Sequence, residues 1–251
     1  MFLVKSSLSD VVKHQYQFKL KAYIDLFNSL IVMQLIAIVF SLSGIGQGSR
    51  GSFDIDLNIN YYTDDYVVVF TIIWAFTIAI QITSKDYREQ VFPFVTNNLA
   101  QHLSNILFLL TASAIGSILA ILSRYFFQVI IRFIANYDQI FVTGLTITFT
   151  ELLMGIIATI LYVFLFSALG YLIGMLVQLN KIFIAIIPAS FIGILFYFSK
   201  VGGFSGDNFI YRLLIFYFQE KVFFLFLLKM ILTSALLYGI SYFISSRLEV
   251  R

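Results

Sequence analysis

The chain has 251 residues, of which 60% are hydrophobic, 18% aromatic and only 12% charged, with a formal net charge of +3. A soluble domain carries about 25% charged residues, so this chain has too little polar surface to cover a globule in water. The composition therefore predicts an integral membrane protein. Because the chain has no cysteine, disulfides, thiolate zinc sites, iron–sulfur clusters and cysteine nucleophiles are excluded.

The first predicted element is a helix within residues 1–22 that lies in the membrane interface. It contains no uninterrupted apolar stretch, so we expect no cleavable signal peptide. Apolar residues alternate with lysines, which suits a helix resting on an anionic leaflet; an ordinary solvated helix is the alternative. The residues concerned are Val11, Val12, Phe18, Leu20, Lys13, Lys19 and Lys21.

Six apolar stretches follow, each near the roughly 20 residues that a helix needs to cross a bilayer. Their continuous apolar character disfavours barrel strands, in which polar and apolar residues alternate. The sequence therefore predicts an all-α membrane protein that forms a single transmembrane domain over residues 1–251. The predicted spans are residues 24–44, 66–83, 103–123, 149–177, 182–199 and 222–245.

Two segments between the spans are harder to assign. Residues 124–141 could extend the third helix, lie flat on the membrane or dip partway into it. A complete extra span is disfavoured because it would place Arg132 near the middle of the bilayer. Residues 200–221 have the pattern of an outer, partly re-entrant segment.

The distribution of lysine and arginine predicts that both termini are cytoplasmic. In this orientation the inside segments include the basic residues of both termini, together with Lys85 and Lys181, whereas the loop 46–65 contains several aspartates and only Arg50. Basic residues on the outer side oppose this orientation: Arg124, Arg132, Lys200, Arg212 and Lys221. We expect the protein in a cell membrane, as in the bacterial plasma membrane.

The polar stretch SKDYREQVFPFVTNN, residues 84–98, separates the second and third spans. Thr83 followed by Asp86 resembles a capping box, and Pro93 ends the helix that begins there. A short helix with charges at its start and aromatic residues at its end favours docking on another protein; a solvated loop is the alternative. The residues expected in this helix are Asp86, Tyr87, Arg88, Glu89, Gln90, Val91, Phe92 and Phe94.

The order of these elements resembles the ABC-2 type transporter permeases, the membrane subunits of ATP-binding cassette exporters. The resemblance includes the amphipathic start, the six spans, the charged helix after the second span, the turn GYLIGMLVQLNK, the proline-bearing IIPASFIG and the basic tail SSRLEVR. It implies that residues 84–98 contain a coupling helix that fits a groove on a cytoplasmic ABC ATPase. It also implies a second permease copy or a homologous permease, with ATP and Mg bound by the ATPase.

The sequence contains no pattern that indicates an enzyme. There is no P-loop, no paired acid and base and no Ser–His–Asp set, and the GQGSRG stretch follows a membrane helix rather than a strand. His14 and His102 lie far apart and are interpreted as interfacial polar residues. We therefore expect a transport subunit without a cofactor of its own and without a nucleic-acid partner.

Ionisable residues near the membrane are candidates for a substrate pathway. Asp25 lies near the inner end of the first span, Glu151 near the outer end of the fourth, and Lys229 within the sixth. Two interpretations of Lys229 remain open: its side chain extends outward to the interface, or it pairs with Glu151.

Three further residues concern helix geometry. Gly170 and Gly174 could let the fourth helix approach a neighbour closely, or they could simply make it flexible. Pro188 is expected to kink the fifth span, which could shape a substrate path, although many membrane helices contain a proline without such a role.

The resemblance implies ATP-driven export by a permease dimer. Spans rich in aromatic residues and poor in charge favour an amphipathic substrate. Within the family that the chain resembles, export of toxin or antimicrobial peptides is the first expectation. Export of lipid, polysaccharide or drug is the alternative. A carrier that does not use ATP, or a membrane scaffold, would be a different class of protein.

Overall fold

The structure of the protein is a computed structural model. It describes residues 7–42, 46–52, 55–61, 65–90, 98–134, 148–200, 212, 215–217, 219–220 and 222–248.

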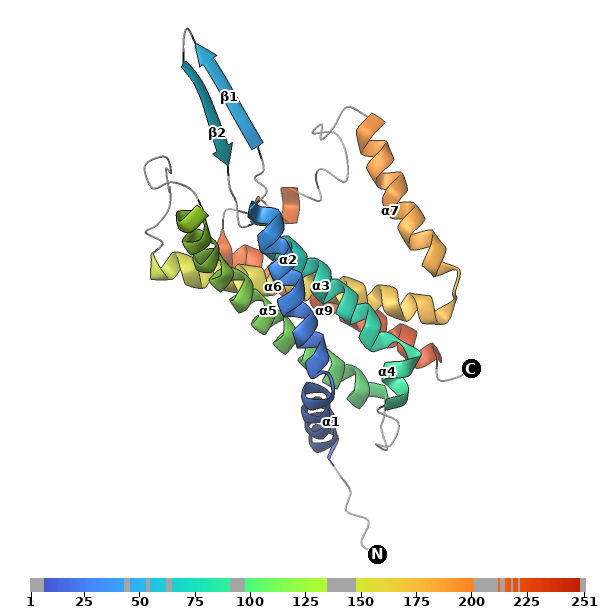
Figure 1. Cartoon of the computed structure of the whole chain (residues 1–251). Coiled ribbons are helices and arrows are strands. Elements are labelled where there is room, and N and C mark those ends of the chain that lie inside the picture. Colours follow the sequence, from blue (N-terminus) through green and yellow to red (C-terminus); the bar gives the residue numbers. More distant parts are fainter. Residues whose placement is uncertain are drawn as a thin grey trace, which may run out of the picture.

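Five long helices form the body of the molecule (Figure 1). Each is long and apolar enough to cross a membrane, which supports the prediction of a helical, multi-pass membrane protein. The described residues thus provide five such helices where the sequence predicted six spans. They are α2 (Ile24–Leu42), α3 (Asp65–Thr83), α5 (Asn98–Ile134), α6 (Phe149–Leu179) and α9 (Phe223–Leu248).

The predicted fifth span corresponds to α7 (Phe183–Lys200), which differs from the other five helices. It stands apart from the bundle, connected to the end of α6 by a short turn (Figure 1). Its apolar part within the described residues, Phe183–Gly193, is shorter than a membrane span. Pro188 lies inside this helix, and most of its described side chains are exposed.

A β-hairpin connects α2 to α3, where the sequence predicted an outer loop. β1 (Gly46–Ser52) pairs antiparallel with β2 (Ile55–Tyr61), with Gly46 opposite Tyr61 and Ser52 opposite Ile55. The body of the molecule is helical as predicted, and the hairpin is an addition to that prediction. Its physical reason is visible in IDLNINY, where apolar and polar residues alternate with the period of two that a strand requires.

The third predicted span is the central part of a longer helix. α5 continues through Arg124 to Ile134, so the first part of the segment 124–141 extends the third helix, one of the three alternatives. Residues 135–147 and most of 201–221 lie outside the described part of the chain.

The largest contact between two helices joins α3 to α6, and two glycines of α6 lie in it. A Cβ atom placed on Gly170 would collide with the backbone carbonyl of Phe76, and one on Gly174 would collide with the side chain of Thr83. Glycine at these positions lets the two backbones approach to a distance that no other residue permits. The contact continues into a core that includes Trp74.

Two shorter helices cover one end of the bundle. α1 (Leu8–Ala22) packs against α5, and α4 (Lys85–Gln90) follows α3 after a single residue. In Figure 1 both lie at the lower end, opposite the hairpin.

We predict that Gly170→Ala destabilises the protein. The new methyl group would meet a backbone carbonyl, which cannot move aside without displacing α3, and overpacking of this kind costs about 1–3 kcal/mol of unfolding free energy. Unfolding in a titration of mixed micelles with denaturing detergent measures the loss.

Gly155→Ala is the matched control, because it lies in the same helix and no atom lies within 4 Å of the position that its Cβ would occupy. This variant should be neutral, or more stable by up to about 1 kcal/mol from helix propensity. Equal stability of the two variants would contradict the close-packing interpretation.

Candidate functional site

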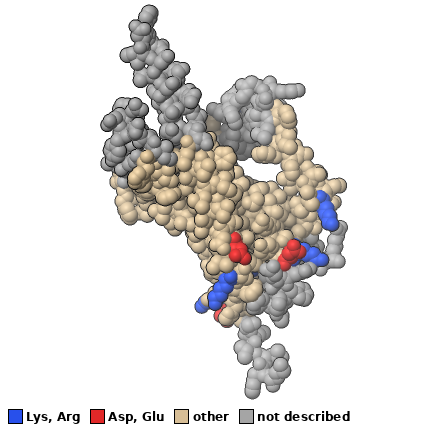
Figure 2. Space-filling model, in the orientation of Figure 1, with Lys and Arg blue, Asp and Glu red and all other residues tan. Residues whose placement is uncertain are grey.

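The end of the molecule formed by α1 and α4 gathers most of the charged side chains visible in Figure 2. On the face shown, the described helical surface above this end is almost entirely uncharged, with one basic group at its right edge. Lys85 and Asp86 are exposed at the charged end. A charged surface at the end of an apolar bundle is suited to contact with water and with a soluble partner.

α4 is attached to the rest of the molecule by a pair of tyrosines. The ring of Tyr23, at the junction of α1 and α2, meets the ring of Tyr87 edge-to-face at 4.9 Å between centroids. The Tyr23 hydroxyl donates a hydrogen bond to the Tyr87 carbonyl at 3.4 Å, and its ring also contacts Phe108 of α5 at 5.7 Å. Burial and the neighbouring Tyr87 raise the pKa of Tyr23 to about 12, so this hydroxyl stays a donor at neutral pH.

The residues predicted for the coupling helix are described only at its start. Asp86 is exposed and Tyr87 is half-buried against Tyr23. Arg88, Glu89 and Gln90 belong to the helical backbone of α4. Val91, Phe92 and Phe94 lie outside the described residues.

α1 is attached to α5 by a buried lysine. Lys19 is 1% exposed, and its Nζ donates to Ser104 Oγ and to Asn105 Oδ1, both at 2.5 Å, and to the Gln101 carbonyl at 3.4 Å. Ser104 in turn donates to Gln15 Oε1 at 3.0 Å. The sequence placed Lys19 among the lysines that face lipid headgroups, and the structure shows instead that it points into the protein.

The described residues provide Lys19 with neutral acceptors but no carboxylate. Removal of a charged ammonium group from water without a counter-charge favours its neutral form. Desolvation therefore lowers the pKa of Lys19 from its ordinary value of 10.5 to about 7.

The hydrogen bonds continue from Asn105 of α5 to two further helices, α6 and α9. Asn105 Nδ2 donates to the Tyr171 hydroxyl at 3.2 Å, which lies 3.1 Å from His102 Nδ1. His102 Nε2 lies 3.0 Å from the Tyr238 carbonyl. A carbonyl oxygen only accepts, so Nε2 carries a proton; in the neutral ring Nδ1 then accepts from the Tyr171 hydroxyl. We call this set, from Lys19 through Asn105, Tyr171 and His102 to Tyr238, the buried polar network.

His102 is thus a buried residue that bridges α5, α6 and α9, and not an interfacial one as the sequence suggested. His14 is exposed on α1. Within the described ranges no group of three or more His, Cys, Asp or Glu side chains could hold a metal ion.

The three ionisable residues proposed for a pathway lie apart from this network. Asp25 is exposed in the first turn of α2. Glu151 is exposed in the first turn of α6, where its carboxylate accepts a hydrogen bond from the Thr148 backbone N–H at 3.0 Å. It therefore stabilises the start of its own helix and does not pair with Lys229.

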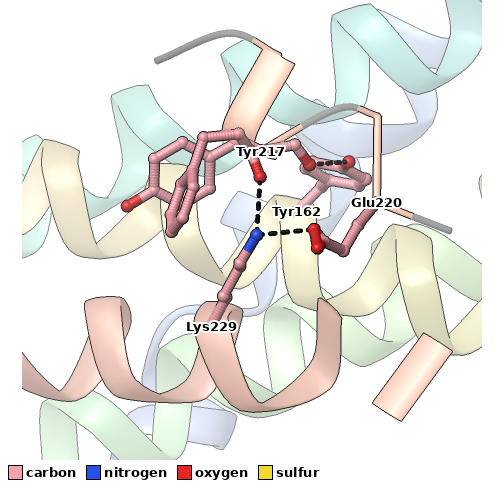
Figure 3. Close-up of polar contacts among 5 residues, drawn as sticks. Tyr162, Tyr217, Glu220 and Lys229 are labelled. Carbon is pink, nitrogen blue, oxygen red and sulfur yellow. Dashed lines mark hydrogen bonds and ion pairs between the residues drawn. The ribbon is translucent and has the colours of Figure 1, made fainter. Parts of the chain in front are cut away.

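Lys229 pairs with Glu220 at 2.6 Å (Figure 3), and not with Glu151 as one of the two interpretations had it. Its Nζ also donates to the Phe216 carbonyl at 3.1 Å and lies 3.6 Å from the centre of the Phe216 ring. Beside it, the Tyr162 hydroxyl donates to the Tyr217 carbonyl at 2.9 Å. These bonds attach Phe216, Tyr217 and Glu220 to α6 and α9.

Sequence reasoning missed the buried polar network, although a signal for it is present. Gln101, Ser104 and Asn105 are spaced by three and four residues inside an apolar stretch, so they share one face of a helix. A polar stripe on a membrane helix faces other protein rather than lipid. The partner on α1 could not be identified this way, because α1 itself is polar.

No family model, curated protein or solved structure matches this chain. The function proposed below therefore rests on the residues and their arrangement.

We predict that the stability of the protein depends on pH through Lys19. The unfolded state holds a proton on Lys19 up to about pH 10.5, whereas the folded state releases it near pH 7. Stability is therefore lowest below about pH 7 and rises with pH between these values, by at most about 1.4 kcal/mol per pH unit. Wild type should gain stability over Lys19→Met as the pH is raised from 6 to 9.

The matched control is Lys21→Met, since Lys21 is exposed on the same helix. Its stability should follow wild type at every pH. A constant difference between wild type and Lys19→Met across this range would show that burial does not shift the titration of Lys19.

Proposed function

We propose that this chain is the membrane-spanning permease subunit of an ATP-driven ABC exporter. The observation that carries the proposal is the short charged helix α4, located between two candidate membrane spans and attached to the bundle by Tyr87. The resemblance of the sequence to ABC-2 permeases supplies the class of partner, a cytoplasmic ABC ATPase that binds ATP and Mg.

The contacts of α4 suit the transmission of a movement. α4 follows α3 directly, because Ser84 alone separates them and its N–H bonds to the Gln81 carbonyl at 2.9 Å. A displacement of α4 would therefore move α3, and α3 would move α6 through the close contact at Gly170. The contact between Tyr23 and Tyr87 also connects α4 to α1 and α2. An ATPase that pushed on α4 would act on the whole bundle.

The remaining parts of the proposal follow from the sequence. Two permease copies, identical or homologous, would enclose the path, since one bundle of this size encloses little space for it. Amphipathic peptides, such as toxin or antimicrobial peptides, are the proposed substrate, with lipid, polysaccharide or drug as the alternative. We place the protein in a cell membrane with both termini in the cytoplasm.

A carrier that does not use ATP is the second candidate, and the buried polar network favours it. Lys19 and His102 are buried ionisable residues within one set of hydrogen bonds, which is a common arrangement in proton-coupled carriers. The two candidates differ in their energy source. Transport by the carrier would stop when the proton gradient is collapsed, whereas transport by the exporter would stop when ATP is depleted.

We predict that a cysteine at Asp86 cross-links to a cassette-type ATPase. The chain has no native cysteine, so Asp86→Cys is a single reactive site, and Asp86 is exposed on α4. A thiol cross-linker with a photoreactive second arm, applied in intact membranes, should capture a protein that mass spectrometry identifies by its P-loop sequence.

Phe149→Cys is the matched control. Phe149 is 72% exposed at the start of α6. This position is far from α4, because it is the other end of α6 that packs against the end of α3. It should capture no ATPase. Cross-linking from neither position, in membranes where the ATPase is present, would favour the carrier.

A further inference from the structure

A cleft opens on the side of the bundle between α5, α6 and α9. Its volume is about 660 Å³, within the range of about 300–1,000 Å³ that is typical of small-molecule sites. Its walls are almost entirely apolar. The cleft is lined by Leu99, His102, Leu103, Ile106, Leu110, Leu161, Phe164, Ile231, Ser234, Ala235, Tyr238, Gly239 and Tyr242.

The length of the cleft matches one leaflet of a bilayer. On α5 its lining residues extend from Leu99 to Leu110, and on α9 from Tyr242 back to Ile231. Either interval is about 16 Å at the rise of an α-helix, while half of the hydrocarbon core is about 15 Å. The cleft therefore begins at the end of the bundle that carries α1 and α4 and ends near the middle of the membrane.

Toward its deep end the cleft has one polar lining residue, Ser234, whose hydroxyl donates to the Met230 carbonyl at 2.7 Å. Two further polar side chains lie at the end nearest α1 and α4. His102 and Tyr242 lie there, with ring centroids 5.5 Å apart, whereas Leu110, Leu161 and Ile231 at the deep end are aliphatic. The nitrogens of His102 are already bonded to Tyr171 and Tyr238. The Tyr242 hydroxyl has no hydrogen-bond partner among the described residues, so it remains a donor for a ligand at headgroup depth.

We propose that this cleft is a specific binding site for one acyl chain of a phospholipid in the leaflet on the α1 and α4 side. The chain would fill the apolar length, and the ester oxygen at its head would accept the hydrogen bond of Tyr242. A helix of a second copy is a poorer occupant, because it would need about 30 Å of apolar groove. The inference rests on the cleft alone and holds for an exporter and for a carrier.

Gly239 provides a way to fill the cleft without disturbing the fold. It lines the cleft, and no atom lies within 4 Å of the position its Cβ would occupy. A large side chain there would project into the open volume. Gly155 has the same freedom on α6 but does not line the cleft, so Gly239→Phe and Gly155→Phe form a matched pair.

The test uses the full chain in vesicles that contain phosphatidylglycerol with a photoreactive group in one acyl chain. After illumination, peptides from residues 99–110 and 231–242 should carry the label in wild type and in Gly155→Phe. In Gly239→Phe the labelling should fall several-fold. Ala235→Leu narrows the same cleft at a second position and should also lower it. Thermal unfolding and size-exclusion profiles identify any variant that fails to fold.

A second arm tests the head of the site. Loss of one hydrogen bond in Tyr242→Phe should weaken retention of the labelled lipid about two- to tenfold through detergent washing, while Gly155→Phe retains it as wild type does. Equal labelling in wild type, Gly239→Phe and Ala235→Leu would overturn the proposal, because it would show only the general lipid that surrounds any membrane helix. An equal loss in Gly239→Phe and Gly155→Phe would overturn it too.

Discussion

The close contact of α3 and α6 is the constraint on which the rest of the structure depends. In a lipid environment apolar side chains gain little by leaving the lipid for another helix, so close packing and interhelical hydrogen bonds must hold the helices together. Gly170 provides that packing, because its missing side chain lets α6 lie against the Phe76 carbonyl. Tyr171 follows it in sequence and is fully buried. The contact therefore also places the Tyr171 hydroxyl where His102 and Asn105 can reach it.

The buried polar network supplies the second kind of attachment. It connects α1 to α5 through Lys19, α5 to α6 through Asn105 and Tyr171, and α5 to α9 through His102. Burial of a lysine without a carboxylate opposes folding near neutral pH, so α1 is attached by a group that is sensitive to pH.

His102 lies between the buried polar network and the apolar cleft. On one side it belongs to the network that leads to α1, and on the other it lines the apolar cleft between α5, α6 and α9. A lipid chain in the cleft would touch the same ring whose nitrogens join α6 to α9. The proposed contact with an ATPase at α4 and the proposed lipid site thus share the end of the bundle where α5 begins.

The sequence by itself determined the class of protein, since long apolar stretches can be satisfied only in a membrane, and it located α4 from the charges and the proline around it. The alternation of apolar and polar residues in IDLNINY indicates a strand, but the polar composition of the surrounding loop obscures this period of two. Only the tertiary structure decided that Lys19 points inward, that Lys229 pairs with Glu220 and that Gly170 lies against Phe76. Each of these contacts joins residues that are distant in sequence or lie on separate elements. Local pattern shows what a side chain needs, but which neighbour provides it depends on how the helices pack.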